Sequence, residues 1–200
     1  MTPEREAKIK RVLNYRQAGL AVVMENVHDP HNISAVMRTC DAVGVQDVYV
    51  LNTLIPRHQK FGKASSASAM GWLTIHQYDN TAECMEAVKK RYTKIYATHL
   101  GVSSQSLYEL NLAESTALVF GNEHAGVTEG CLACCDGNFI IPQVGMVQSL
   151  NISVACAITL YEAFRQRQNS GLYNGVPTLP DNEWNALAKQ WGVYKENNIE

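Results

Sequence analysis

Residues 142 to 153 combine small polar side chains with proline and glycine in a pattern that could bind a ligand. An apolar run from Phe139 to Ile141 predicts a strand, and the loop after it ends at Ser149. Serine is a favoured N-cap residue, so we expect a helix that begins at Leu150. The unpaired N–H groups of a first helical turn carry partial positive charge. The loop is therefore predicted to present polar groups to a ligand at the positive end of a helix.

Two further loops follow predicted strands in the same way. Thr98 to Gly101 follows the apolar run 94 to 98, and Gly121 to Glu123 follows the run 117 to 120. Short apolar runs that alternate with helices are typical of a parallel sheet covered on both faces. Ligands of such sheets bind at the carboxyl ends of the strands, where glycines let the backbone approach closely. We expect the three loops to form one binding site.

Arg38 is predicted to be an exposed cation on a helix. It lies on a helix predicted from Asn32 to Val43, whose apolar stripe is formed by Ile33, Val36, Met37 and Cys40. Arg38 is on the opposite face and should contact solvent or a partner. A guanidinium has a pKa above about 12 and rarely releases a proton. A side chain that stays charged in this way could clamp a phosphate. A surface salt bridge is the alternative.

Several other motifs fail on their spacing. No G-x-G-x-x-G is present, and the P-loop-like spacing of Gly121 to Gly126 is followed by Val127 and Thr128, without the required lysine. The histidines show no metal-ligand spacing, so we expect no metal. One group of cysteines has metal-like or redox-like spacing, but burial as structural thiols is favoured for Cys131, Cys134 and Cys135. Three histidines flank the proposed site as substrate contacts or ordinary loop residues: His28, His31 and His124.

The remaining pattern predicts one α/β domain with helical extensions at both ends. Helices are expected at 2–17, 32–43, 80–92, 149–168 and 183–190, and strands at 20–25, 47–51, 73–76, 94–98, 117–120 and 138–141. Gly44 is expected to end the second helix. We predict an N-terminal extension over 1–18, the main domain over 19–168 and a C-terminal extension over 169–200.

The composition is that of an ordinary globular protein. The 200 residues are 46% hydrophobic and 18% charged. No apolar run approaches the roughly 18 residues that a membrane span needs. The six cysteines lack the spacing of a disulfide framework, which favours a reducing compartment. We therefore expect a cytoplasmic protein.

Basic residues are concentrated in two segments, although the formal net charge is −2. Residues 5 to 16 carry five basic side chains against Glu6 alone, and residues 57 to 63 carry three and no acid. Local patches of this kind can bind phosphate on a protein of slightly negative total charge, although solvated faces are the alternative. The candidate phosphate contacts are Arg5, Lys8, Arg11, Arg16, Arg57, Lys60 and Lys63.

The blocks Asn32 to Arg38, Phe120 to Glu123 and 142 to 153 resemble the three motifs of the SpoU/TrmH family of RNA ribose 2′-O-methyltransferases, which use S-adenosylmethionine. The resemblance covers nearly the whole chain. Its segment from Glu25 to Asn32 is most similar to members that methylate guanosine 18 of tRNA. The resemblance implies a C-terminal trefoil knot that forms the methyl-donor pocket. It also implies a homodimer in which Arg38 lies near the donor pocket of the other subunit.

The resemblance assigns roles residue by residue. The implied catalytic residues are Asn32, Arg38, Glu123, Ser149 and Asn151. In that role we expect Arg38 to clamp an RNA phosphate or to stabilise a developing alkoxide, while that phosphate or a water accepts the hydroxyl proton. The implied donor pocket consists of Thr98, His99, Leu100, Gly121, Asn122, Glu123, Ile141, Met146, Ser149 and Leu150. RNA contacts would come from His31, Arg38 and the basic residues of the two segments. Some apolar residues of the long helix would lie in the dimer interface instead of the core, among Ile152, Ile158 and Tyr161.

The sequence departs from the family pattern before Trp72. The stretch Ser65 to Gly71 lacks the usual acid, which bears on how that loop contacts RNA. Three alternatives to a tRNA guanosine-18 enzyme stay open. They are 2′-O-methylation of another tRNA or rRNA nucleotide, a non-catalytic knotted RNA-binding module, and a small-molecule enzyme with a nucleotide cofactor. The absent phosphate loops argue against the last.

Overall fold

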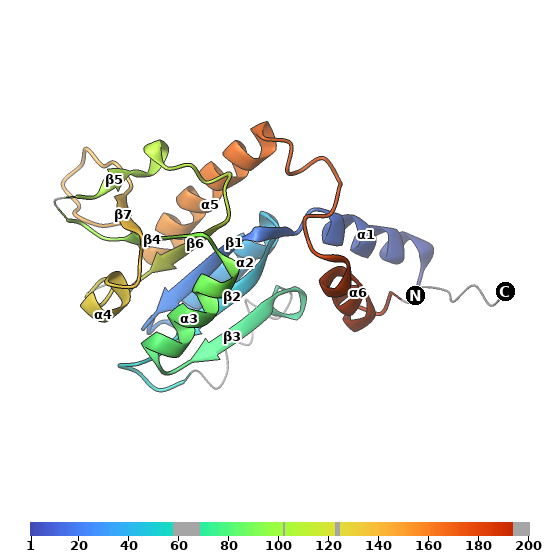
Figure 1. Cartoon of the computed structure of the whole chain (residues 1–200), viewed down its shortest axis with the longest axis horizontal. Helices are drawn as coiled ribbons and strands as arrows, with labels where there is room; N and C mark the ends of the chain where they lie inside the picture. The colour runs from blue at the N-terminus through green and yellow to red at the C-terminus, as the bar shows by residue number, and fades with distance from the viewer. Residues whose placement is uncertain (58–68, 102, 123–124, 194–200) are drawn as a thin grey trace.

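A parallel sheet of seven strands forms the centre of the molecule (Figure 1). The computed structural model describes residues 1–57, 69–101, 103–122 and 125–193. The strand order is β3-β2-β1-β6-β4-β7-β5, and every neighbouring pair is parallel. The strands are β1 (Gln17–Glu25), β2 (Val45–Leu51), β3 (Thr74–Tyr78), β4 (Lys94–Thr98), β5 (Gln105–Ser106), β6 (Thr116–Phe120) and β7 (Gly137–Ile140). The predicted parallel sheet is confirmed. Only the two-residue β5 was not predicted.

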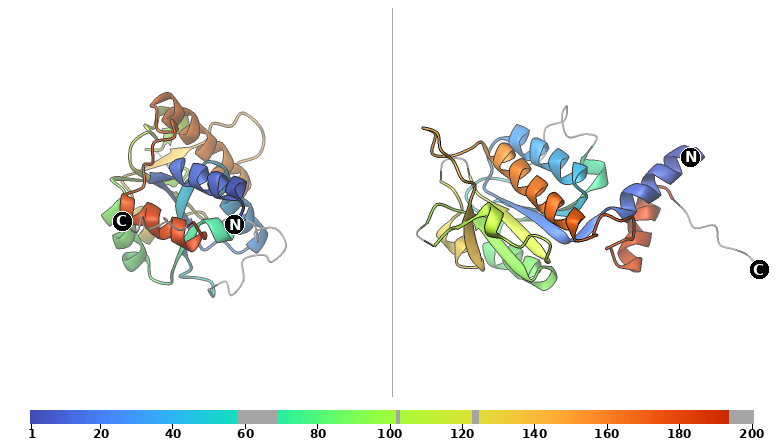
Figure 2. Two further views of the ribbon diagram at one scale, coloured as in Figure 1. Left: turned by 90° about the vertical axis from the view of Figure 1, so that its right-hand side faces the viewer. Right: turned by 90° about the horizontal axis from the view of Figure 1, so that it is seen from above.

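Helices cover both faces of this sheet, as the two views of Figure 2 show. α2 (Pro30–Ala42) and α5 (Ile152–Asn169) lie side by side on one face, and α3 (Thr81–Arg91) lies on the other. Successive residues of a strand point to opposite faces, so Val22 packs into the cluster beneath α2 and α5 whereas Val23 packs beneath α3. The short elements are η1 (Met70–Trp72), η2 (Leu107–Glu109) and α4 (Glu129–Leu132).

The helix starts follow from local capping. The Asn80 side chain accepts from the N–H of Glu83 at 3.1 Å and begins α3, as predicted. Asp29 caps α2 by accepting from the N–H of His31. The predicted start of the long helix is wrong: α5 begins at Ile152 and its cap is Asn151, not Ser149. The loop before α5 is therefore two residues longer than expected, and Ser149 lies within it.

The predicted apolar stripe of α2 is confirmed. Ile33, Val36, Met37 and Cys40 are all fully buried, whereas Arg38 is exposed on the opposite side. Gly44 follows α2 with a φ of +81°, and a Cβ there would lie 2.4 Å from the backbone oxygen of Tyr15. A side chain is therefore excluded at this position, because both the backbone angle and the space require glycine.

The two extensions pack against each other beside the amino-terminal ends of the central strands. α1 (Pro3–Asn14) and α6 (Asp181–Gln190) bury a cluster that includes Leu13 and Trp191. The indole of Trp184 donates to the Asn14 side chain at 3.0 Å. Figure 2 (right) shows both helices at one end of the molecule, opposite the loop that precedes α5. Two helices that are far apart in the sequence, α1 and α6, thus pack together.

Arg16 is not a surface phosphate contact, contrary to the prediction. Its side chain is fully buried and forms a 2.6 Å ion pair with Asp41 at the end of α2. It also donates to the carbonyls of Val45 and Trp72, and its guanidinium lies 5.4 Å from the ring centre of Trp191. Burial lowers the pKa of Arg16. The extensions and the sheet are therefore joined through this arginine, since it contacts elements from both.

Across the described part of the chain, no helix has the length and apolar character needed to cross a bilayer.

Candidate active site

The three predicted ligand loops lie at the carboxyl edge of the sheet, which is the end where its parallel strands finish. β6, β4 and β7 are neighbours in the sheet and run parallel. Their carboxyl ends at Phe120, Thr98 and Ile140 therefore point the same way, at the left of Figure 1. The segments that follow them are the loops expected to bind a ligand. This juxtaposition is what the sequence analysis predicted.

The loop after β6 is a tight turn built on glycine. Asn122 and Gly126 exchange two backbone hydrogen bonds, of 3.0 and 2.9 Å. A Cβ on Gly121 would lie 2.2 Å from the carbonyl carbon of Gly126, so only glycine fits there. The side chain of Asn122 donates to the backbone oxygen of Asn26 and accepts from the N–H of Ala125. The loop is thereby held against the end of β1.

Glu25 ends β1 and Asn26 follows it, and together they anchor two loops, although neither was predicted from the sequence to be a functional residue. The buried Glu25 carboxylate accepts from the N–H and the hydroxyl of Thr128, at 2.8 and 2.5 Å. Asn26 has a φ of 52°, and its side chain accepts from the N–H groups of Thr53 and Leu54. An acid inside an apolar strand was the available signal, because buried carboxylates need partners.

The first and third motifs meet directly. The side-chain amide of Asn151 donates to the side-chain oxygen of Asn32 at 3.1 Å. The other end of the Asn151 side chain accepts from the N–H and hydroxyl of Ser153, which caps α5. Asn151 thus has two functions, because one oxygen caps a helix and one nitrogen links the two motifs.

Arg38 lies six residues after Asn32 on the same helix, which corresponds to about 9 Å along the axis. Its side chain is exposed and forms no ion pair within the described ranges. The alternative of a structural surface salt bridge therefore has no support among these residues. A free guanidinium on an exposed helix face is available to bind a phosphate.

The strand-end loops carry exposed apolar side chains. Val144 and Met146, in the loop before α5, and Leu100, in the loop after β4, are each at least 80% exposed. Ser149 is exposed and Leu150 is partly buried in the same loop. In the loop after β4, Thr98 donates to the carbonyl of Val119 and the backbone of His99 is bonded to Phe139.

These residues fit S-adenosylmethionine, which is an adenosine joined to a sulfonium. The exposed Leu100 and Met146 offer apolar surface to an adenine, and the backbone of the loops offers donors and acceptors to its edge. At Gly121 the missing side chain lets the backbone of Gly126 pack closely, which fixes the shape of the loop after β6. Within the described ranges, no group of three or more histidine, cysteine, aspartate or glutamate side chains is arranged to hold a metal ion.

The other predicted site residues are spread over the molecule. Arg5, Lys8 and Arg11 are exposed on α1, and His31 is exposed near the start of α2. Arg57 donates to the carbonyl of Gln77. Ile141 is partly buried just after β7. Four further residues named from the sequence lie outside the described residues: Lys60, Lys63, Glu123 and His124.

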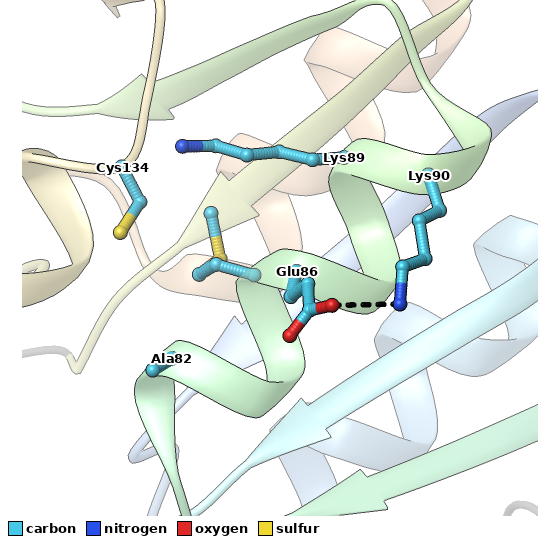
Figure 3. A pocket seen from close by; sticks show the side chains of 6 residues that line it. Ala82, Glu86, Lys89, Lys90 and Cys134 are labelled. Carbon is cyan, nitrogen blue, oxygen red and sulfur yellow. Dashed lines mark ion pairs between the residues drawn. The ribbon is translucent and has the colours of Figure 1, made fainter.

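The face of the sheet that α3 covers carries a shallow pocket of about 350 Å³ (Figure 3). Its polar side chains include Lys89, Cys134 and the Glu86–Lys90 ion pair of 2.7 Å. Of the neighbouring cysteines, Cys131 is buried, and a hydrogen bond with Cys135 together with burial raises its pKa. All six cysteines are free thiols. Because Cys131 is buried, the prediction of a buried structural thiol is confirmed for this residue. Cys134 and Cys135 are partly exposed.

The fold and the loop cluster define an α/β protein that holds a nucleotide-like ligand at the carboxyl edge of its sheet. Comparison with known proteins then specifies the family. Residues 19–161 match the model of the SpoU rRNA Methylase family. The chain belongs to this family, and the resemblance stated from its motifs is confirmed.

Individual relatives are similar over nearly the full length. A tRNA (guanosine(18)-2′-O)-methyltransferase of Thermus thermophilus is 39% identical over 192 residues, 95% of this chain and 96% of that protein. The crystal structure of a TrmH/SpoU tRNA modifying enzyme from A. aeolicus superposes with a TM-score of 0.86 at 37% identity, covering 94% of each chain. The SpoU methyltransferase AviRb from Streptomyces viridochromogenes, in complex with the cofactor AdoMet, superposes with a TM-score of 0.67 at 26% identity, over 78% of this chain and 64% of that one.

Proposed function

We propose that this protein transfers a methyl group from S-adenosylmethionine to the ribose 2′-oxygen of guanosine 18 in tRNA. The observation that carries the proposal is the 3.1 Å contact between Asn32 and Asn151, which joins the first and third motifs beside the strand-end loops. The full-length similarity to a guanosine-18 enzyme supports the substrate. The bound cofactor in a related structure supports the donor.

When bound, S-adenosylmethionine supplies a methyl group on a positively charged sulfur, which needs no metal to be transferred. We assign its binding to the loops after β4, β6 and β7, including Leu100, Gly121 and Met146. Their backbone would hold the adenosine part, and the exposed apolar side chains would exclude water from it. Positioning of this kind supplies much of the rate of a transfer between two bound groups. In this proposal the donor pocket has the trefoil knot of the family.

Arg38 has the charge for the second half of the chemistry. We assign it to bind an RNA phosphate or to stabilise negative charge that develops on the 2′-oxygen. Asn32, held by Asn151, would orient the substrate. Ser149 and Glu123 complete the proposed catalytic set. The proton of the 2′-hydroxyl would pass to a phosphate or a water, because a guanidinium already carries its full complement of protons.

We further propose a homodimer. As the resemblance of the motifs implies, Arg38 of one subunit would lie near the donor pocket of the other. Tyr161 and Val154 on α5 are 55% and 46% exposed and are candidate interface residues. Of the three apolar residues considered for that interface, Ile152 is 5% exposed in the single chain and belongs to its core. In this proposal 1–18 and 169–200 are extensions of a methyltransferase domain at 19–168, in a cytoplasmic enzyme.

The test is transfer of labelled methyl from S-adenosylmethionine to an unmodified tRNA transcript, followed by mapping of the modified nucleotide. Label on the ribose of guanosine 18 is the expected result. A transcript with a 2′-deoxy residue at that position is the matched control and should accept no label there. Label at another tRNA or rRNA nucleotide would keep the mechanism and overturn the substrate. Donor binding without transfer to any RNA would favour a non-catalytic RNA-binding module.

A further inference from the structure

A second pocket, of about 260 Å³, lies where α1, the end of α2, α5 and the segment after α5 meet. Its lining includes Lys8, Arg11, Tyr15, Asp41, Phe164 and Tyr173. Four segments distant in the sequence therefore contribute to one cavity, at the end of the molecule opposite the donor loops. The combination of cations with aromatic rings distinguishes it from the pocket beside α3, which has no aromatic side chain in its lining.

The aromatic rings of this pocket are held in fixed positions. Tyr173 packs on Phe164 with ring centres 4.6 Å apart, and its hydroxyl donates to the carbonyl of Val43 at 2.5 Å. Burial raises the pKa of Tyr173 to about 12, so this donor keeps its proton at neutral pH. Tyr15 is nearly parallel to Tyr173, with an interplanar angle of 23° and ring centres 6.5 Å apart. Aromatic faces arranged in this way accept a nucleobase by stacking.

The charges at the pocket match a phosphate with a base attached. Lys8 and Arg11 are exposed, and neither forms an ion pair in the described part of the chain. The Arg11 guanidinium lies 5.9 Å from the ring centre of Tyr15. The acid of the pocket, Asp41, is one-third exposed and is already paired with Arg16 at 2.6 Å. Its carboxylate can still accept a hydrogen bond from a base amino group.

One face of α2 leads from this pocket to Arg38. His31, Ala35, Arg38 and Ala42 follow one another at spacings of three or four residues, so they form a single stripe along α2. Ala42 is in the pocket lining, and it lies about 6 Å along the helix axis from Arg38. An RNA strand whose phosphate contacts Arg38 would therefore reach this pocket within a few nucleotides.

We propose that this pocket binds one unstacked base of the RNA substrate, with Tyr15 and Tyr173 contacting the base and Lys8 and Arg11 contacting the adjoining phosphates. The proposal rests on the proposed function, because it takes RNA as the substrate. It adds a contact with an extruded nucleotide at a distance from the reacting ribose. The extensions would then contribute to recognition of a folded RNA as well as to its electrostatic attraction.

The test compares Tyr15→Leu with Tyr15→Phe in the full-length protein. Affinity for an unmodified tRNA transcript is measured by fluorescence anisotropy, alongside the KM and kcat of methyl transfer. Loss of a base–aromatic stack should weaken binding by about 5- to 150-fold in Tyr15→Leu and raise KM with kcat unchanged. Tyr15→Phe keeps the ring and should bind like the wild type. Donor affinity, measured by calorimetry, should be the same in all three proteins.

Lys8→Ala and Arg11→Ala test the phosphate contacts. Each should make the slope of log affinity against log salt shallower by about 0.7 to 0.9, the value for one phosphate contact. Lys10→Ala is the matched control, because Lys10 is on the same helix, pairs with Glu6 at 2.6 Å and does not line the pocket. Equal slopes for the Lys8 and Lys10 variants and the wild type would overturn the phosphate contact.

Ultraviolet crosslinking of wild-type protein to tRNA gives a readout that does not depend on a variant that folds. Crosslinks from one nucleotide to peptides with Tyr15 or Tyr173 are expected. If the wild type methylates tRNA but crosslinks only elsewhere and Tyr15→Leu binds normally, the pocket proposal is overturned and the proposed function stands. If the wild type neither binds nor methylates RNA, the proposed function itself fails, and the pocket proposal fails with it.

Discussion

Polar side chains have opposite roles at the carboxyl edge of the parallel sheet and at its amino edge, where the strands begin. At the carboxyl edge, polar groups such as Asn151 and Ser149 are exposed on loops. At the amino edge, Arg16 and Arg167 are buried, at 0% and 2% exposure, and bonded on several sides. Arg167 donates to the carbonyls of Leu112, Gly19 and Glu114 and to the Gln17 side chain.

This difference separates chemistry from stability. The buried Arg167 guanidinium uses its donors on groups inside the protein, whereas the exposed Arg38 has no partner among the described residues and can donate to a substrate. Residue type and local charge do not distinguish Arg16 from Arg38. Their burial and partners do. Substitutions at the two edges should therefore affect different measurements: stability at the amino edge and methyl transfer at the carboxyl edge.

Arg167→Ala should cause the largest loss, about 3 to 5 kcal/mol in the free energy of unfolding, because buried carbonyls lose their donor. Burial lowers the pKa of Arg167 to about 10, so the side chain is charged at neutral pH and the lost bonds are charge-assisted. Urea denaturation measures the loss. An Arg167→Ala protein with wild-type stability would show that the buried network does not hold the amino edge together.

Arg38→Ala should reduce methyl transfer by about 10²- to 10³-fold, the usual effect of removing one group that stabilises transition-state charge. Unfolding free energy and donor affinity should be unchanged, since the side chain is exposed. Single-turnover transfer and calorimetry measure the two. Arg38→Lys is the matched variant, which keeps the charge without the planar fork and should recover only part of the rate. Lost donor binding in Arg38→Ala would contradict the role assigned here.

Glu25→Gln should destabilise the protein by about 1.5 to 3 kcal/mol and weaken donor binding, because it removes a charged acceptor from Thr128 and loosens the loop after β6. Glu25 lies at the carboxyl edge but is buried. The variant therefore tests whether burial or position in the sheet determines if stability or donor binding is lost. Thr128→Ser keeps both donors and is the control. If donor affinity survives in Glu25→Gln while stability falls, Glu25 only supports the fold.

Asn151→Ala should cost about 1 kcal/mol, the usual value of an N-cap, and should also lower the transfer rate. Asn151→Ser separates the two functions of this side chain. A serine oxygen can still cap α5, so stability should return, but it has no amide to donate to Asn32 at the 3.1 Å contact. Thermal unfolding and transfer kinetics on both variants are the measurements. Full activity in Asn151→Ser would show that the link to Asn32 is dispensable.

Arg165→Ala should have the smallest effect, because Arg165 is an exposed partner of Glu162 one turn away on α5. Its hydrogen bond lowers the pKa of the Glu162 carboxyl. A lowered pKa of an acid contributes stability above the pKa of the unfolded chain, and that contribution disappears as pH falls through the lowered value. The small difference between the variant and the wild type should therefore vanish in acid. A difference that grows in acid would contradict this pairing.

Local sequence was sufficient to predict those features that depend on neighbouring residues. The stripe of α2, the cap at Asn80 and the exposure of Arg38 follow from spacing and side-chain type, and all three are confirmed. The start of α5 was not predicted, because Ser149 and Asn151 are both good caps. In the structure Asn151 is the cap, and its side chain also contacts Asn32, which is 119 positions away in the chain.

Distant contacts decided the rest. The sequence by itself determined that this is a parallel α/β protein with three loops at strand ends, because periodicity and glycine placement are local properties. Only the tertiary structure buried Arg16 against Asp41 and Trp191, and only it brought Tyr15 beside Tyr173. The physical reason is that the burial of a charge depends on which segments pack around it. In this protein those segments come from opposite ends of the chain.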